Sequence, residues 1–600
     1  MKVMLAAINA KYIHSNLGIY SLKAYADRML RQGPEVTVEL AEYTINHQKD
    51  LILQDIYRRK PDIIGFSCYI WNIGFVRELL PDIIRVLPGV SIWLGGPEVS
   101  YDGEKVLRER PDVTGIMRGE GEETFAELVR CYGEWEEELS PDQGPAEQGL
   151  PAQEWTGTRI PPGLRQVPGL MFREDDGVVM DTGLRPAMDM SRIPFPYASL
   201  DMKDLEHRII YYESSRGCPF SCSYCLSSID RQVRFRSLEL VKEELAFFLS
   251  AGVPQVKFVD RTFNCRKSHA MAIWQFIRDH DEGCTNFHFE IAADLLDEEE
   301  LDLLSSLRPG LIQLEIGVQS TCQDTLEAIH RKTDIDRIRR ISAAINAGHN
   351  IHQHLDLIAG LPYESLERFR QSFDDVYGME PEQLQLGFLK VLKGSYMEEM
   401  APAYGIVSSA NPPYEVLSTR WLAYSGILEL KGVEEMVEVY HNSRQFTTTL
   451  KQLESLYDSP YKMFLDMAAY YEANHLTGIS HSRIARYEIL CRIIEERLDG
   501  GKPGMEYFRD LLMYDLYLRE NVKSRPSFAR DQAPYKERIK EIFRREEAEP
   551  CYLKLYEGYG SRQMAKMAHA EAMGDGSLVL FDYRNRDPLT YNAATYWIKA

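Results

Sequence analysis

The 600-residue chain is predicted to be an α/β protein built in three parts. Strand-like and helix-like segments alternate through residues 1–133, which is typical of a doubly wound, Rossmann-like parallel sheet. Six further strand–helix units follow at 206–400, which is typical of a partial (β/α)6 barrel. Apolar residues at three- and four-residue spacing then predict a mostly α-helical region at 401–600.

The composition is that of a globular protein, with 44% hydrophobic and 27% charged residues. Its length exceeds what one hydrophobic core supports, so several domains are expected. No run of about 18 apolar residues is present, and the N-terminus lacks the regions of a signal peptide, so we expect no membrane span and a cytoplasmic location. The formal net charge of −22 argues against a nonspecific electrostatic hold on nucleic acid.

The N-terminal segment alternates strands with helices. Strands are predicted at 2–8, 35–41, 63–68, 90–94 and 113–117, and helices at 17–25, 51–57 and 75–86. Ligands of such sheets bind beyond the carboxyl ends of the strands. Three loops at those ends are polar or rich in glycine, namely 9–18, 95–98 and 118–122. Glycines let a backbone approach a flat ligand closely, although tight turns use them too.

Residues 134–205 are interpreted as a linker between the first two parts. The stretch 134–151 is rich in Glu, Pro and Gly and is predicted to be an exposed insertion. Two short apolar runs, at 169–173 and 177–180, predict a β-hairpin. Two prolines at 193–196 then favour an extended crossing, because proline restricts its own backbone and that of the preceding residue.

Three of the ten cysteines, Cys218, Cys222 and Cys225, lie in one short loop after a predicted strand at 208–213. Thiolates are ligands of zinc and of iron–sulfur clusters, and a zinc site would need a fourth nearby ligand. In a 4Fe-4S cluster, an iron without a protein thiolate can bind a substrate or cofactor directly. The other cysteines are scattered and do not indicate a disulfide framework.

The Cys-x3-Cys-x2-Cys spacing, with Tyr224 before the last cysteine, resembles the radical S-adenosylmethionine (SAM) superfamily. The resemblance implies a 4Fe-4S cluster on the three cysteines, with SAM on the open iron. The rest of the predicted barrel agrees with it. Strands are expected at 255–260, 287–292, 311–318, 352–358 and 384–391, and helices at 237–250, 268–279, 298–307, 336–347 and 366–377.

The same resemblance implies SAM contacts at the ends of the barrel strands. The implied residues are Tyr224, Asp260, Glu315, Gln319, Ser320, Gly360 and Leu389. Asp260 and Glu315 have an alternative role, which is to cap the helices that follow them. Cys265 and Cys322 lie on the same rim, but their spacing does not make them ligands.

The glycine-rich loops of the first part, together with residues 66–72, resemble the cobalamin-binding domain that precedes many radical SAM enzymes. The residues implied to contact cobalamin are His14, Ser67, Trp71, Gly95, Gly96, Pro97, Gly119, Glu120 and Gly121. Cobalamin mutases place Asp-x-His-x-x-Gly after the first strand, with the histidine as the lower axial ligand. Here the aspartate is absent and the glycine is one residue late. His14 is therefore either a cobalt ligand or a loop histidine beside the corrin, and Trp71 either faces the lower side of cobalamin or packs at a domain seam.

The C-terminal part is predicted to hold helices at 421–440, 450–474, 484–498 and 505–521, and a strand at 578–583. Its arrangement resembles the C-terminal extension of an uncharacterised branch of cobalamin-dependent radical enzymes. No motif in it identifies a substrate.

Together these resemblances imply a cobalamin-dependent radical SAM enzyme that methylates an unactivated carbon. A small molecule, a lipid or a peptide is the expected substrate, and flavodoxin or ferredoxin the expected type of electron donor. One alternative is a radical rearrangement, cyclisation or oxidation in which cobalamin does not methylate. The other is a cobalamin- or redox-sensing binding module. Methylthiolation is disfavoured, because only Cys68 and Cys131 precede the central motif.

Overall fold

The computed structural model describes residues 1–138, 160–174, 176–498 and 502–599. Its contacts divide the chain into two units. The first comprises residues 1–295, 327–332 and 389–419, and the second comprises 296–326, 333–388 and 420–600. The division falls within the predicted barrel, after the third of its six strands.

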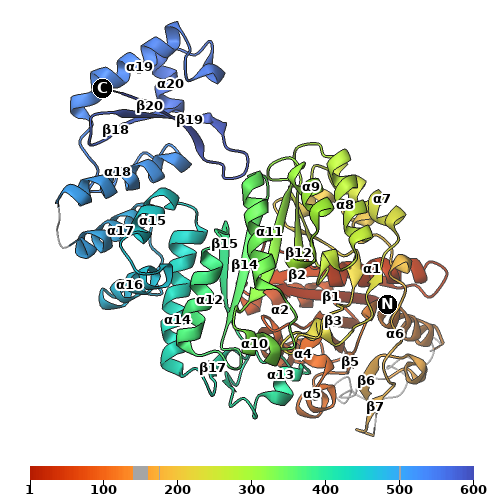
Figure 1. Ribbon diagram of the computed structural model, residues 1–600. Helices are drawn as coiled ribbons and strands as arrows, with labels where there is room; N and C mark the ends of the chain where they lie inside the picture. The colour runs from red at the N-terminus through yellow and green to blue at the C-terminus, as the bar shows by residue number, and fades with distance from the viewer. Residues whose placement is uncertain (139–159, 175, 499–501, 600) are drawn as a thin grey trace. The chain divides into compact units, whose positions relative to one another are not determined.

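The first unit begins with a seven-stranded sheet in the order β2-β1-β3-β4-β5-β6-β7 (Figure 1). Its parallel strands are β1 Lys2–Asn9, β2 Thr37–Thr44, β3 Ile63–Ser67, β4 Ser91–Gly95 and β5 Gly115–Met117. Strand β1 is buried from Val3 to Asn9, as expected for a strand covered on both faces. The strand order reverses between β1 and β3, so ligands are expected to bind at the carboxyl ends of these strands.

Six helices accompany the parallel strands: α1 Leu17–Met29, α2 Lys49–Arg59, α3 Ile73–Val86, α4 Pro97–Ser100, α5 Gly103–Glu109 and α6 Gly121–Glu138. The first three confirm the predicted helices. Helix α6 was missed. Residues 134–138, expected to begin an exposed insertion, are largely exposed as expected but form the end of this helix. Phe125, Leu128, Val129 and Tyr132 give α6 an apolar face at helical spacing, which the run of glutamates obscured. Residues 139–151 of the expected insertion lie outside the described ranges.

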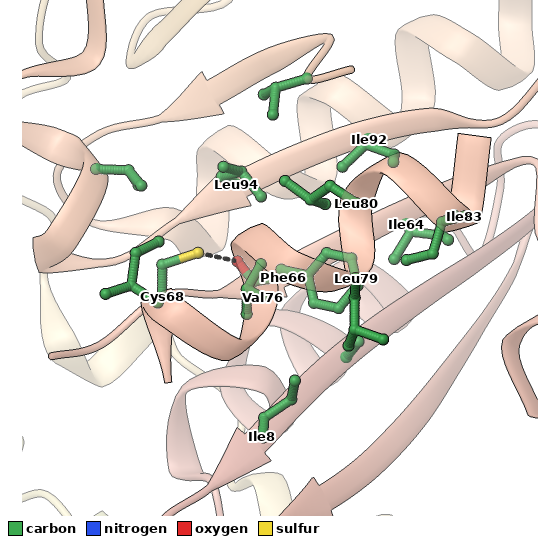
Figure 2. Close-up of a cluster of buried hydrophobic side chains, with 14 of the residues drawn as sticks. Ile8, Ile64, Phe66, Cys68, Val76, Leu79, Leu80, Ile83, Ile92 and Leu94 are labelled. Atoms are coloured by element: carbon green, nitrogen blue, oxygen red, sulfur yellow. Dashed lines mark hydrogen bonds between the residues drawn. The ribbon is translucent and has the colours of Figure 1, made fainter. Parts of the chain in front are cut away.

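Strands and helices of this part pack into one hydrophobic core. Ile8, Ile64 and Phe66 of the strands share one buried cluster with Val76 and Leu80 of α3 (Figure 2). Cys68 belongs to the same cluster, and its thiol donates to the Phe66 carbonyl over 3.7 Å. Burial raises the pKa of Cys68 to about 12, so this cysteine is an unreactive core residue.

The predicted hairpin is present as β6 Leu170–Arg173 and β7 Val179–Asp181. It does not lie free in a linker, because β6 pairs antiparallel with β5 and extends the sheet. The buried side chains of Leu170 and Phe172 explain this attachment, since they add to the core of the N-terminal sheet.

The first unit also holds the first three parallel barrel strands, β8 Ile210–Tyr212, β11 Gln255–Phe258 and β12 Asn286–Ile291, with helices α7 Leu238–Ser250 and α8 Lys267–Asp279. Two short strands, β9 Ser215–Arg216 and β10 Arg234–Phe235, pair antiparallel. They bracket the loop that carries the three cysteines, so this loop is closed at its base by a small ladder.

The second unit holds the other three parallel strands, β13 Ile312–Gln319, β14 His352–Ala359 and β15 Gln383–Phe388, with α9 Glu298–Ser305, α11 Ile335–Gly348 and α12 Leu366–Tyr377. A short helix, α10 Gln323–Ala328, follows β13 at the division between the units. All the predicted barrel strands and helices are thereby confirmed within one or two residues of most of their bounds.

The C-terminal helices are α14 Tyr424–Met436, α15 Thr447–Glu454, α16 Pro460–Ala473, α17 Arg483–Arg497 and α18 Lys502–Arg519. The single helix predicted at 450–474 is two helices, because Ser459 caps a new one that begins at Pro460.

The chain ends in a three-stranded antiparallel sheet rather than in one added strand. It comprises β18 His569–Ala572, β19 Leu578–Arg586 and β20 Ala593–Ile598, with helices α19 Lys536–Ala548 and α20 Ser561–Met567. In the ranges that the structure covers, no helix combines the length and apolar character needed to cross a bilayer.

Candidate cofactor site

A cavity of about 810 Å³ lies in the first unit, at the carboxyl ends of β1, β3, β4 and β5. This is the position expected for a ligand of a doubly wound sheet, and the volume is that of a ligand pocket. Eight of the nine residues predicted to contact cobalamin line it: His14, Ser67, Trp71, Gly95, Gly96, Gly119, Glu120 and Gly121. Pro97 is not among the lining residues and instead begins helix α4.

The same cavity is bordered by the segment that carries the three cysteines. Gly217, which precedes Cys218, and Leu226, which follows Cys225, both line it. Further lining residues come from the strands and loops around this segment: Tyr211, Glu213, Ser215, Arg216, Ser227, Asp230, Arg234, Val259 and Arg261. One space is therefore shared by the sheet loops and the cysteine loop.

Two glycines at this cavity are required by geometry. Gly96 has φ 109°, and a Cβ there would lie 2.5 Å from the Cys68 carbonyl oxygen. Gly217 has φ 89°, and a Cβ there would lie 2.5 Å from the Gln232 carbonyl oxygen. Any other residue at either position would be strained and would collide with the backbone. Gly96 thus shapes the loop after β4, and Gly217 shapes the entry to the cysteine loop.

The cysteine loop is held by backbone hydrogen bonds. Cys218 donates its N–H to the Asp230 carbonyl over 3.0 Å, and Cys225 donates to the Cys222 carbonyl over 3.2 Å. Cys218 and Cys222 are buried, Cys225 is half-buried, and all three thiols are free. Across the described ranges, no three His, Cys, Asp or Glu side chains are grouped to hold a metal ion. The three thiolates of a 4Fe-4S cluster bind different irons, so three free thiols on one constrained loop fit the cluster.

Asp260 lies in the first unit at the end of β11, and its carboxylate is fully buried. It accepts hydrogen bonds from the Ser214 N–H (2.9 Å), the Ser214 hydroxyl (2.7 Å) and the Ser215 hydroxyl (2.5 Å). Burial raises the pKa of Asp260 to about 6. These contacts make Asp260 a positioning residue for the segment that enters the cysteine loop. A contact with SAM stays a prediction.

The other residues predicted to contact SAM divide between the units. Tyr224 and Leu389 belong to the first unit, and Glu315, Gln319, Ser320 and Gly360 belong to the second. In the second unit, the Ser320 hydroxyl donates to Glu364 over 2.7 Å. Gln319 has φ 71° and Gly360 has φ 86°, so both strand ends turn through the left-handed region. Their shared role in binding SAM stays a prediction.

His14 has an orienting partner that the sequence did not reveal. Its Nδ1 lies 2.6 Å from the hydroxyl of Tyr211, a residue on β8. Burial, with Lys11 and Lys257 nearby, lowers the pKa of His14, so the ring is neutral at pH 7. The phenol occupies the role that a carboxylate has in the Asp-x-His motif, which is to fix the ring.

Trp71 is 45% exposed, which does not fit a residue packed at a domain seam. Its ring lies flat against Tyr69, with centroids 4.4 Å apart and an interplanar angle of 5°. Its indole N–H donates to the Ile8 carbonyl over 3.3 Å. Both rings line the cavity, so they present an aromatic surface to it.

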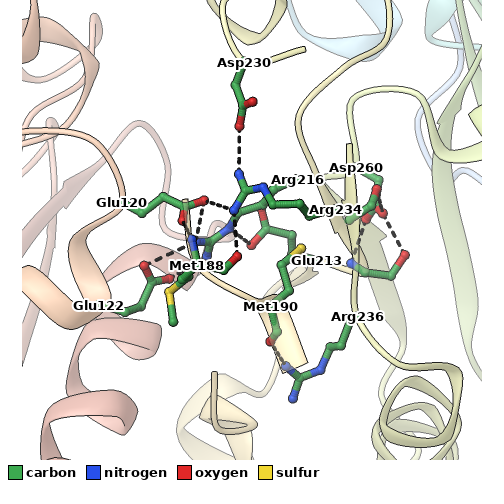
Figure 3. Close-up of polar contacts among 12 residues, drawn as sticks. Glu120, Glu122, Met188, Met190, Glu213, Arg216, Asp230, Arg234, Arg236 and Asp260 are labelled. Carbon is green, nitrogen blue, oxygen red and sulfur yellow. Dashed lines mark hydrogen bonds and ion pairs between the residues drawn. The ribbon is translucent and has the colours of Figure 1, made fainter. Parts of the chain in front are cut away.

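A network of charged side chains joins the sheet loops to the cysteine loop (Figure 3). Glu120 pairs with Arg234 over 2.7 Å and with Arg216 over 3.5 Å, and it accepts from the Met188 N–H over 2.9 Å. Arg216 also pairs with Glu122 over 2.5 Å and with Glu213 over 2.8 Å. Glu120, predicted as a cobalamin contact, therefore also links the loops of the N-terminal sheet to the strands that flank the cysteine loop.

The pKa values of Glu122 and Glu213 are shifted in opposite directions. Burial alone would raise the pKa of Glu122, but the Arg216 guanidinium outweighs it and lowers the pKa. Burial raises the pKa of Glu213, although Arg216 opposes the shift. Sequence reasoning missed Arg216, Arg234 and Glu213, because only their approach to Glu120 and Glu122 in the fold gives them a role.

Three family descriptions match the chain. The B12 binding domain matches residues 3–129, the Radical SAM superfamily matches 212–376, and a protein family of unknown function (DUF4080) matches 402–578. These ranges lie within the predicted parts 1–133, 206–400 and 401–600.

Curated relatives are similar at low identity. An uncharacterized methyltransferase of Pyrococcus horikoshii is 26% identical over 403 residues, which cover 65% of this chain and 79% of that protein. The cobalamin-dependent radical SAM methyltransferase TokK of Streptomyces tokunonensis is 24% identical over 515 residues, covering 79% and 68%. An anaerobic magnesium-protoporphyrin IX monomethyl ester cyclase of Rubrivivax gelatinosus is 24% identical over 371 residues, covering 58% and 60%.

Among solved structures, the cobalamin-dependent S-adenosylmethionine radical enzyme OxsB, with aqua-cobalamin and S-adenosylmethionine bound, aligns with a TM-score of 0.56 and 16% identity. The alignment covers 86% of this chain and 79% of that chain, and it shows a shared fold. The chain therefore joins a B12-binding domain to a radical SAM domain and a DUF4080 region, and its curated relatives include a cobalamin-dependent radical SAM methyltransferase.

Proposed function

We propose that this protein is a cobalamin-dependent radical SAM methyltransferase that methylates an unactivated carbon of its substrate. One observation carries the proposal. The cavity of about 810 Å³ is bordered both by the loops predicted to bind cobalamin and by the residues that flank Cys218 and Cys225. A corrin and a cluster bound there would face the same space.

The chain's own residues bind and orient the cofactors in this proposal. Cys218, Cys222 and Cys225 hold the 4Fe-4S cluster, and the loops after β1, β3, β4 and β5 hold the corrin. When bound, the cluster with SAM supplies a carbon radical, and cobalamin supplies a methyl group. The ion pairs of Arg216 and Arg234 keep the cysteine loop in register with the sheet.

The proposal extends to domains and SAM contacts. The domains are a cobalamin-binding domain at 1–133, a radical SAM domain at 206–400 and a C-terminal domain at 401–600. The segment 134–205, predicted as a linker, adds the end of α6 and the β6–β7 hairpin to the first of them. The residues assigned to SAM are Tyr224, Asp260, Glu315, Gln319, Ser320, Gly360 and Leu389. Their support is their position at the ends of barrel strands or in the cysteine loop.

A radical cyclisation or oxidation, with cobalamin in a non-methylating role, is the second candidate. The similarity to the cyclase of Rubrivivax gelatinosus favours it, because the identity of 24% equals that to TokK. The longer coverage of TokK, 79% of this chain against 58%, favours methylation. The match to the radical SAM family over 212–376 argues against a sensing module without enzyme activity.

The proposed substrate is a small molecule, a lipid or a peptide. We assign the electron supply to a low-potential carrier of the flavodoxin or ferredoxin type. We also propose a cytoplasmic location, because cysteines held free for a cluster require a reducing compartment.

The test is anaerobic reconstitution with iron and sulfide, followed by cobalamin, SAM, a reductant and a panel of candidate substrates. We expect 5'-deoxyadenosine and S-adenosylhomocysteine to form together when the substrate is present. Methyl-labelled SAM would then mark the product. Cys222→Ala serves as the control and should form neither compound.

The outcomes separate the candidates. With the substrate present, 5'-deoxyadenosine without S-adenosylhomocysteine would favour the cyclisation or oxidation. A protein that takes up the cluster but binds no cobalamin would rule out methyl transfer through cobalamin. Absence of 5'-deoxyadenosine in the presence of the substrate would contradict the radical mechanism altogether.

A further inference from the structure

A positively charged side chain lies against the sulfur of the second motif cysteine. Arg331 Nη1 is 3.7 Å from Cys222 Sγ, which is the distance of an N–H···S hydrogen bond. Cys222 is only 6% exposed. Arginine keeps its charge at every physiological pH, so the contact places a positively charged group beside this sulfur.

The position of Arg331 is fixed by backbone contacts to the cysteine loop. Ser223, next to Cys222, donates its N–H to the Ile329 carbonyl over 2.9 Å. The Ser223 carbonyl in turn accepts from the Met397 N–H over 2.8 Å. Residues 327–332 belong to the first unit with the cysteine loop, although the segments that flank them belong to the second.

The neighbouring rings add a second anchor for the same segment. His330 lies beside Tyr396, with ring centroids 5.1 Å apart, and Tyr396 precedes Met397. Residues 329–331 are therefore tied to the cysteine loop through Ser223 and to the 389–419 segment through Tyr396. The backbone on both sides of Arg331 is thus held in place, which keeps its guanidinium beside Cys222.

We propose that Arg331 is a positioning residue that sets the reduction potential of the cluster on Cys218, Cys222 and Cys225. This inference rests on the proposed function. A cluster held by these cysteines would gain one negative charge on reduction by a low-potential carrier. A positive charge and an N–H donor at the Cys222 sulfur stabilise that reduced form, and hydrogen bonds to cluster sulfurs and net charge are known determinants of potential.

The sign of the effect follows directly. Removing the charge destabilises the reduced cluster more than the oxidised one, so the potential falls. Arg331→Gln keeps a shorter polar side chain without the charge, and Arg331→Lys keeps the charge without the planar fork. Lys332→Gln is the matched control, because it removes one positive charge at the next residue, which is exposed.

The experiment is a redox titration of the reconstituted full chain. The electron paramagnetic resonance (EPR) signal of the reduced cluster is the readout at each potential. For Arg331→Gln we expect the ratio of reduced to oxidised cluster at a given potential to fall about tenfold, which is ~59 mV for a one-electron couple. Arg331→Lys should recover more than half of the shift, and Lys332→Gln should titrate like the wild type.

Each result has one meaning. An Arg331→Gln cluster with a wild-type potential would overturn the proposal, as would an equal shift in Lys332→Gln. If Arg331→Gln does not take up iron, uptake by Arg331→Lys supports the role of the charge, and failure of both contradicts it. A wild-type protein that takes up no cluster would instead refute the proposed function, so the two failures are distinguishable.

Discussion

Arg216 and Glu122 form a largely buried ion pair, with side chains 17% and 5% exposed and Nη2 2.5 Å from the nearer carboxylate oxygen. Arg216 ends β9, two residues before Cys218, and Glu122 lies in the first turn of α6. The two residues are 94 positions apart in the sequence. The pair therefore ties the cysteine loop to the end of the sheet at which the cavity opens.

Replacing Glu122 by glutamine should destabilise the first unit by about 3 kcal/mol. Removing one partner of a buried pair typically costs 3–5 kcal/mol, and Glu213 and Glu120 still neutralise Arg216, so the lower end applies. Arg216→Met should cost more, because it leaves Glu122 and Glu213 without their paired cation. Urea unfolding followed by tryptophan fluorescence measures both.

Glu104→Gln is the control for this comparison. Glu104 pairs with Arg108 on an exposed turn of α5, with side chains 58% and 72% exposed. Such surface pairs contribute about 0–1 kcal/mol. Equal losses for Glu104→Gln and Glu122→Gln would show that the buried pair does not hold the loop.

Alanine substitutions at the cysteines should differ sharply in their effect on iron content. Alanine at Cys218, Cys222 or Cys225 should abolish the cluster, because each thiolate binds one iron. Alanine at Cys265 or Cys322 should leave iron, sulfide and the visible absorbance at wild-type levels. Cys284→Ala, at an exposed position, is the matched control. Loss of the cluster in Cys265→Ala would contradict the interpretation of that residue as a spectator.

Local patterns predicted the elements well. The strands and helices of the sheet and barrel follow from periodicity, and the cysteine loop follows from spacing alone. Elements near the ends of the predicted parts were harder to predict. Helix α6 was missed because its glutamates hid an apolar stripe, and β18 and β20 are short strands that form only by pairing with β19.

The contacts that build the site were beyond sequence reasoning for a different reason. Tyr211 and His14 are 197 residues apart, and Arg331 and Cys222 are 109 apart. A single sequence shows which residues can ionise or donate, but not which of them the fold brings together. The glycine loops were found because close backbone approach requires glycines that stand close together in the sequence. The charged network has no such local pattern, because its partners are far apart in the chain.

His14 should not bind cobalt, although it lines the cavity. Its Nδ1 partner is the neutral hydroxyl of Tyr211, which makes the imidazole a weaker ligand than a carboxylate partner would. The EPR spectrum of bound cob(II)alamin should therefore show no nitrogen splitting from an axial imidazole. His14→Gln should leave the spectrum unchanged. A split signal in the wild type that His14→Gln removes would make His14 the lower ligand.

Trp71→Ala should lower the affinity for hydroxocobalamin at least tenfold, because it removes an aromatic surface exposed to the cavity and unstacks Tyr69. Trp71→Phe should recover most of the affinity. Absorbance titration of the apoprotein measures both. Tyr57→Ala is the control, because Tyr57 is an exposed aromatic residue of α2 that does not line the cavity. Equal affinities for Trp71→Ala and the wild type would remove Trp71 from the corrin site.

The stability of the first unit should fall in mild acid through His269. Its Nε2 lies 2.9 Å from the Ser214 hydroxyl, and burial, with Arg266 nearby, lowers its pKa from 6.5 to about 4. In the unfolded chain, His269 becomes protonated as the pH falls below 6.5. In the folded chain, it becomes protonated only near pH 4. The contribution of His269 is therefore complete above pH 6.5 and is lost as the pH falls toward 4.

Asp260, which shares Ser214 with His269, changes stability in the opposite direction over much of the same window. Burial raises its pKa to about 6, so the folded chain takes up a proton before the unfolded chain does. A comparison with His269→Gln isolates the histidine. Between pH 7 and pH 5 the wild type should lose ~2 kcal/mol relative to this variant, at about 1.4 kcal/mol per pH unit below 6.5. Urea unfolding at both pH values tests this, with exposed His280→Gln as the control. A difference that does not change with pH would mean that His269 ionises alike in the folded and unfolded chain.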